Sequence, residues 1–146
     1  HSMVQPTWVM PDPNGKKLYI AGNGSNEIIE VDINDWSITN RIDTGKGPYN
    51  VDVSPNGKYL IATLKGEGKT AIWELGKKRK SLISNTSSVS HGIVISPDSK
   101  YAFVSVEGKG GEPGLVDVID IKKSKIVSSV NIGKQAGGIA FWKLEQ

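Results

Sequence analysis

One histidine is the best candidate for chemistry at a site in this chain. His91 is one of only two histidines, and the other is His1 in a short N-terminal tag-like segment. An imidazole titrates near neutral pH and can act as an acid, a base or a metal ligand. A single histidine does not make a transition-metal site, and the chain has no cysteine for a disulfide or a thiolate zinc site. Two interpretations of His91 stay open: a member of a site that another chain completes, or an ordinary polar loop residue.

Three further residues stand at comparable places, near the start of short apolar segments. They are Trp8, Tyr49 and Asn50. We expect them to line the same opening as His91, where aromatic faces and amides can contact a ligand. For Trp8 the alternative is packing against a neighbouring structural unit or a dimer seam.

The other chemistry-bearing residues do not form a catalytic set. The stretch 108–111 lacks the Lys-Ser/Thr pair and the helix of a phosphate-binding loop, so it predicts a flexible loop. Asp117 and Asp120, like Glu30 and Asp32, fall within strand patterns and give no sign of paired acid–base work. We therefore expect no catalytic residue, no metal site and no cofactor.

These candidates belong to a repeat with a step of 42 residues. Pro13, Pro55 and Pro97 each begin a Pro-Asn-Gly-Lys or Pro-Asp-Ser-Lys turn, followed by a similar apolar segment. A period of this length, filled with short strands and turns, is typical of a β-propeller blade. Each unit predicts four strands, A to D, running outward from the centre. The expected strands are 7–10, 17–21, 27–33 and 37–43; 49–53, 59–64, 70–75 and 81–84 (weak); and 91–95, 101–106, 115–121 and 125–132.

The repeat predicts an all-β fold, a β-propeller arc of three four-stranded blades plus one extra inner strand. Blades are expected at about 7–47, 48–89 and 90–135, and residues 137–142 repeat the pattern of strand A. Residues 1–3 resemble a tag scar, which leaves 4–146 as a single domain. Closed propellers have about four to eight blades, and repeat units need stacked neighbours to bury their cores. We therefore expect the ring to be completed by a second copy, as a homodimer, or by the missing blades of a longer chain.

The charge of the chain is concentrated on one expected face. Net charge is +3, short of the profile of a nucleic-acid-binding protein, and no apolar run reaches the roughly 18 residues of a membrane helix. Strands A and C both end on one face, and the turns there are rich in basic residues. The candidate basic face comprises Lys77, Lys78, Arg79, Lys80, Lys122, Lys123 and Lys125. It could steer an anionic partner, or simply keep the turns solvated.

Four stretches carry a family resemblance: Ser54–Leu60, Ser96–Tyr101, Leu115–Ile121 and Ile132–Ile139. They resemble the YVTN-type (40-residue repeat) β-propeller family of bacterial and archaeal proteins over nearly all of residues 6–142. The resemblance implies the C-terminal half of a seven-bladed propeller, and a periplasmic or secreted location.

Two functions are consistent with these patterns. The first is a non-catalytic module for protein or ligand binding, expected from the repeats and from the lack of a catalytic set. The second is a fragment of an enzyme or cofactor-binding propeller, lactonase-like or of the haem/quinone type, with its site at the central channel. The resemblance allows the second because related propellers build copper or haem sites from histidines on several blades.

Overall fold

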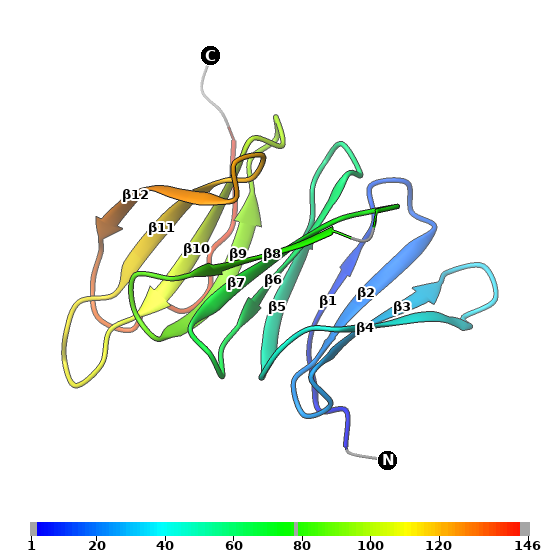
Figure 1. The fold of residues 1–146 in the computed structure, drawn as a ribbon, viewed down its shortest axis with the longest axis horizontal. Coiled ribbons are helices and arrows are strands. Elements are labelled where there is room, and N and C mark those ends of the chain that lie inside the picture. Colours follow the sequence, from blue (N-terminus) through cyan, green and yellow to red (C-terminus); the bar gives the residue numbers. More distant parts are fainter. Residues whose placement is uncertain (1–2, 78, 144–146) are drawn as a thin grey trace.

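In the computed structural model, the regular structure of the described residues, 3–77 and 79–143, is entirely β-strand (Figure 1). His1 and Ser2 of the expected scar lie outside the described residues, and so does Lys78. No helix in the described part has the length and apolar character needed to cross a membrane. The strands are β1 (Pro6–Pro11), β2 (Lys17–Gly22), β3 (Glu27–Asp32), β4 (Ile38–Asp43), β5 (Pro48–Val53), β6 (Tyr59–Leu64), β7 (Lys69–Glu74), β8 (Arg79–Ser84), β9 (Val89–Ile95), β10 (Tyr101–Glu107), β11 (Leu115–Asp120) and β12 (Lys125–Asn131).

The strands form three four-stranded antiparallel sheets, each made of four consecutive strands. We call β1–β4 blade 1, β5–β8 blade 2 and β9–β12 blade 3. Each expected strand of the three units forms within two residues of its predicted bounds. Strand D of the second unit, expected to be weak, pairs with β7 along its whole length as β8.

The turn that follows each inner strand is encoded by the repeat. Its closing residue adopts a left-handed conformation, with φ of 65° at Gly15, 68° at Gly57 and 60° at Ser99. This region is open to glycine and costly for most other residues. In the second turn, the Asn56 side-chain oxygen also accepts a hydrogen bond from the Lys58 amide at 3.0 Å. These turns fix where each first hairpin reverses and hence the register of the blade.

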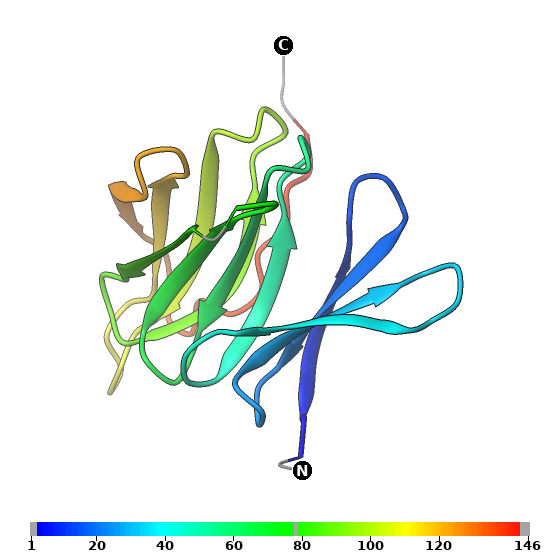
Figure 2. The same ribbon diagram turned by 45° about the vertical axis from the view of Figure 1, so that its right-hand side comes forward.

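Adjacent blades pack face to face, with β1 beside β5 and β5 beside β9 (Figure 2). The inner strands therefore line one side of the arc. An apolar core fills each seam. The seam between blades 1 and 2 holds Tyr19, Ala21, Ile28, Val51, Val53, Leu60, Ala62, Leu64, Ala71 and Trp73. The seam between blades 2 and 3 holds Ile61, Ile72, Ile83, Ile93, Ile95, Ala102, Val104, Val106, Ile119 and Ile121.

A hydroxyl group links one blade to the inner strand of the next. Thr63 Oγ1 accepts a hydrogen bond from the Asn50 amide of its own blade at 3.1 Å. It donates one to the His91 carbonyl of the following blade at 2.6 Å. The link therefore fixes the position of β9 along the direction of β5.

The expected thirteenth strand at 137–142 does not form, and this prediction was wrong. Ser105, which is 42 residues after Thr63, repeats the same link: it accepts from the Gly92 amide and donates to the Gly137 carbonyl. The segment therefore lies where the inner strand of a next blade would begin. It has no β-ladder because no neighbouring strand in the described part of the chain pairs with its backbone.

Candidate functional site

Two of the expected channel residues meet on the inner side of the arc. The rings of Tyr49 on β5 and His91 on β9 lie with centroids 4.3 Å apart and planes inclined by 52°. The two residues are 42 positions apart, so they occupy the same place in neighbouring inner strands. The packing of β5 beside β9 therefore brings them together.

Two charged residues that the sequence analysis did not select complete the group. Lys65 Nζ lies 4.6 Å from the centroid of the Tyr49 ring, a cation–π distance. Glu107 Oε1 lies 3.2 Å from His91 Nε2 and 3.6 Å from Lys65 Nζ. We call Tyr49, Lys65, His91 and Glu107 the channel-side cluster. Lys65 and Glu107 are also 42 residues apart, at the end of strand B in two successive units, and that spacing was the available signal.

The electrostatics of the cluster favour a neutral imidazole. Partial burial lowers the pKa of His91, the positive charge of Lys65 lowers it further, and Glu107 opposes the shift. A neutral imidazole can donate from Nε2 to the Glu107 carboxylate, which fixes its tautomer. The cluster thus offers a tilted pair of aromatic rings beside a lysine whose charge Glu107 balances.

The other two expected channel residues lie outside the cluster. Asn50 is buried in blade 2, and its Oδ1 has no hydrogen-bond partner among the described residues. Trp8 is 45% exposed and, with Pro6, Val9 and Ile20, lines an apolar hollow on blade 1. Within the described part of the chain, Trp8 makes no ring contact with Tyr49 or His91.

Two of the seven residues of the expected basic face pair with acids that end strand C. Glu74 pairs with Lys77 at 2.5 Å, and Asp120 pairs with Lys123 at 3.1 Å. The sequence analysis selected the basic residues of this face without these two carboxylates, which lower its positive charge.

The rest of the basic face divides into three kinds of residue. Lys80 Nζ donates to the Thr44 carbonyl and lies 5.4 Å from the Trp73 ring centroid, which ties it to the first seam. Lys125 begins β12 and is exposed. Arg79 and Lys122 face the seam between blades 2 and 3 and make no ion pair within the described part of the chain. With Lys125, they are the basic residues of this face for which no ion pair and no side-chain hydrogen bond is found in the part of the chain that the structure describes.

In the described ranges, no three His, Asp or Glu side chains gather closely enough to hold a metal ion. The channel-side cluster contains one histidine and one carboxylate. It can hold or move a proton at His91 Nε2, and it can contact a ligand through the Tyr49 ring and the Lys65 ammonium group.

The chain has the fold of a β-propeller arc, and solved structures bear this out. It is similar to Kuenenia stuttgartiensis hydrazine synthase, with a TM-score of 0.82 and 24% identity over 94% of this chain and 38% of that chain. It is also similar to the RRP9 WD40 repeats, with a TM-score of 0.79 and 15% identity over 93% and 41%. A putative 6-phosphogluconolactonase from Bacteroides uniformis gives a TM-score of 0.71 and 18% identity over 89% and 42%.

These likenesses carry the fold alone, because identity stays below 25%. The chain spans 38% to 42% of the length of the solved chains it matches. No family model matches the chain, and neither does a curated protein. Propellers of this shape include both WD40 repeat domains and a lactonase-like protein, so shape does not choose between binding and catalysis.

Proposed function

We propose that this chain is a non-catalytic binding module of YVTN-type repeats that supplies three blades of a larger propeller ring. The observation that carries the proposal is the exposure of one repeat position. Val9 is 53% exposed, whereas Val51 and Ile93, one and two repeats later, are 0% and 4% exposed. The outer face of blade 1 therefore exposes apolar side chains at a position that a neighbouring blade covers in the other repeats.

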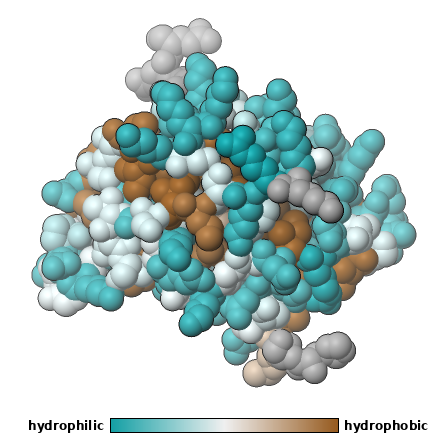
Figure 3. All heavy atoms as spheres, viewed as in Figure 1, coloured by the Kyte–Doolittle hydropathy of each residue, from teal (hydrophilic) through white to brown (hydrophobic). Residues whose placement is uncertain are grey.

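The opposite end of the arc supports the same conclusion. Tyr101, Val127 and Val130 of blade 3 are 38% to 51% exposed. Figure 3 shows hydrophobic surface gathered over blade 3 between hydrophilic rims. Contiguous apolar surface of this kind marks an interaction site. Its occupant in this proposal is another blade, from a second copy or from a longer chain.

The channel-side cluster is the proposed binding surface of the module. Its charged and polar groups already contact one another, through Lys65, His91 and Glu107, as in a surface built for recognition. An aromatic face with a nearby ammonium and carboxylate suits a polar protein loop or a small polar ligand. The completed ring would place this surface around the central channel.

Ring completion is tested by molecular mass in solution. Light scattering on the eluting protein should give at least twice 15.7 kDa for self-association. Val9→Lys should return the protein to one copy, because it places a charge in the seam. Asn14→Lys, on an exposed turn, is the matched control and should leave the mass unchanged.

A single-copy mass would contradict self-association and direct attention to blades of a longer chain. In that case the free end faces should bind the dye 8-anilinonaphthalene-1-sulfonate, and Val9→Lys should reduce its fluorescence. A single copy that binds no dye would contradict ring completion by either route.

The His91–Glu107 pair supports a second candidate function, part of a hydrolytic propeller. A neutral imidazole held by a carboxylate can act as a general base. The test is hydrolysis of a six-membered lactone by the wild-type chain and by His91→Gln, with a metal analysis and an absorbance spectrum of the same preparations. Under the binding proposal neither protein exceeds the buffer rate, both analyses are blank, and the two proteins unfold alike within about 1 kcal/mol. Turnover that His91→Gln abolishes would favour the enzyme instead.

A further inference from the structure

Two clefts open between neighbouring blades on the face that carries the turns after strands A and C. The first, of about 440 Å³, lies between blades 1 and 2 and is lined in part by Lys17 and Glu30. The second, of about 180 Å³, lies between blades 2 and 3 and is lined in part by Tyr59, Ile72 and Arg79. The repeat places them at equivalent positions, so they can be compared residue by residue.

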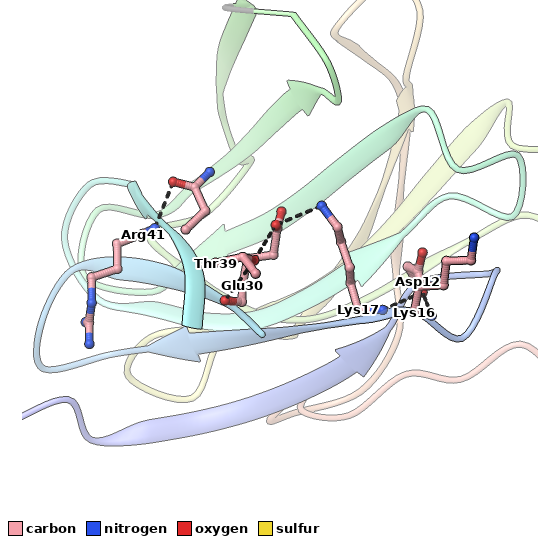
Figure 4. Close-up of polar contacts among 7 residues, drawn as sticks. Asp12, Lys16, Lys17, Glu30, Thr39 and Arg41 are labelled. Atoms are coloured by element: carbon pink, nitrogen blue, oxygen red, sulfur yellow. Dashed lines mark hydrogen bonds and ion pairs between the residues drawn. The ribbon is translucent and has the colours of Figure 1, made fainter. Parts of the chain in front are cut away.

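The first cleft contains its own anion. Glu30 is 8% exposed, and its Oε1 accepts hydrogen bonds from Lys17 Nζ at 2.8 Å and Thr39 Oγ1 at 2.7 Å (Figure 4). Burial alone would raise the pKa of Glu30, but the bonds from Lys17 and Thr39 hold it below its usual value. A buried carboxylate is therefore satisfied inside this seam.

The second cleft has hydroxyl donors at the two donor positions and lacks the equivalent carboxylate. The positions 42 residues after Lys17, Glu30 and Thr39 are Tyr59, Ile72 and Ser81. All three line the cleft, and no hydrogen bond of the Tyr59 or Ser81 hydroxyl is found in the part of the chain that the structure describes.

The charge at the rim of the second cleft is positive. Arg79 and Lys122 line it without an ion pair to any described residue. Its carboxylate, Glu74, is held by Lys77 at 2.5 Å, and the pKa of Glu74 is lowered first by that bond and, more weakly, by the charges of Arg79 and Lys58. The cleft thus offers two cations without an ion pair and two hydroxyl donors, while its one carboxylate, Glu74, is already paired with Lys77.

We propose that the second cleft binds an oxyanion supplied from outside, a phosphate group. It would occupy the place that Glu30 fills in the first cleft. Arg79 and Lys122 would supply charge, and the Tyr59 and Ser81 hydroxyls would donate hydrogen bonds. A volume of about 180 Å³ suits a single tetrahedral group, since clefts that hold whole drug-sized ligands start at about 300 Å³. The site lies on the face opposite the channel-side cluster and is independent of the proposed function.

The test is an NMR titration of the labelled chain with inorganic phosphate at constant ionic strength, against chloride. Saturable shifts are expected in the turns between β7 and β8 and between β11 and β12. Arg79→Gln and Lys122→Gln should each weaken binding about tenfold, the loss expected for one charge-assisted hydrogen bond. Lys109→Gln, on an exposed loop of the opposite face, is the control and should bind as the wild type does.

A second variant transfers the chemistry of the first cleft into the second. Tyr59→Lys combined with Ile72→Glu supplies an internal ion pair and should abolish the phosphate shifts. Arg79→Gln lies at the exposed rim, so it remains informative even if the double variant fails to fold.

The phosphate group could belong to a phosphorylated protein chain or to free inorganic phosphate. Titration with a phosphoserine peptide and with its unphosphorylated form distinguishes these two sources. Tighter binding of the phosphopeptide than of inorganic phosphate assigns the site to a phosphorylated chain, and the reverse assigns it to free phosphate. The proposal is overturned if phosphate and chloride give the same shifts, or if Arg79→Gln binds phosphate as well as the wild type.

Discussion

Asp117→Ala is expected to lower the free energy of unfolding by about 3 kcal/mol or more. Asp117 on β11 is fully buried and faces blade 2. Its carboxylate accepts from the Asn85 amide group at 3.2 Å and from the Thr86 backbone amide at 2.9 Å. It also accepts from the hydroxyls of Thr86 at 2.5 Å and Ser129 at 2.6 Å. Alanine would remove the acceptor that these four donor groups share and leave a cavity at the fully buried position of Asp117.

Asp117→Asn separates the loss of hydrogen bonds from the loss of charge. One amide oxygen can still accept from the Thr86 and Asn85 nitrogen atoms. The amide nitrogen can donate to the Thr86 and Ser129 hydroxyls, which are free to reverse their direction. Asparagine should therefore cost about 1 kcal/mol, well below alanine.

The measurement is urea unfolding at neutral pH, followed by circular dichroism. Asp35→Ala is the matched control, because Asp35 is an exposed turn carboxylate that accepts from the Ser37 amide. It should change stability by less than about 1 kcal/mol. Equal stability of Asp117→Ala and Asp35→Ala would show that the buried network does not hold the loop after β8 to blade 3.

The blades were predictable from the sequence because their determinants are local. Apolar alternation and turn residues such as Gly15 and Gly57 specify each hairpin, and the 42-residue step repeats them. The segment 137–142 has the same local pattern, yet a strand also needs a partner, which a local pattern does not supply. The repeat therefore predicts the complete blades better than it predicts a single strand at the end of the arc.

The candidate site was predictable only in part. Tyr49 and His91 were selected because equivalent inner-strand positions share one opening, and the structure places their rings in contact. The sequence analysis did not select Lys65 and Glu107, since a charged residue at the end of a strand does not by itself reveal what it faces. Asp117 was interpreted as an ordinary strand carboxylate, because three of its four donor groups belong to Asn85 and Thr86 in the loop after β8, which is distant in the sequence.

Asp52→Asn is expected to stabilise the chain progressively, relative to the wild type, as the pH rises from 4 to 7.5. Asp52 on β5 is 9% exposed and accepts from the Ile95 amide of blade 3 at 2.9 Å and from the Val53 amide at 2.8 Å. Burial raises its pKa from 3.8 to about 6, against the opposing effect of these two bonds. The native state therefore holds this proton more tightly than the unfolded chain does.

The sign of the effect follows from that difference. Stability from the bound proton is fully present below about pH 3.8 and is lost as the pH rises through about 6. The whole loss is about 3 kcal/mol, since one pKa unit corresponds to about 1.4 kcal/mol, and about 2 kcal/mol of it falls between pH 4 and 7.5. Asparagine at position 52 carries no titrating proton, so the gap between variant and wild type should widen by that amount whatever its offset at pH 4.

Urea unfolding at pH 4 and 7.5 measures this widening directly. Asp98→Asn is the control of opposite sign, because hydrogen bonds from Ser96 and Lys100 lower the pKa of Asp98 to about 2. Its stabilising effect is lost only as the pH falls through about 2, so Asp98→Asn should not gain on the wild type between pH 4 and 7.5. Parallel pH profiles for Asp52→Asn and the wild type would mean that water reaches the Asp52 carboxylate, and that the seam between blades 2 and 3 is open at the channel side. A widening gap would instead mean that the Asp52 carboxylate is shielded from water in the folded seam between blades 2 and 3.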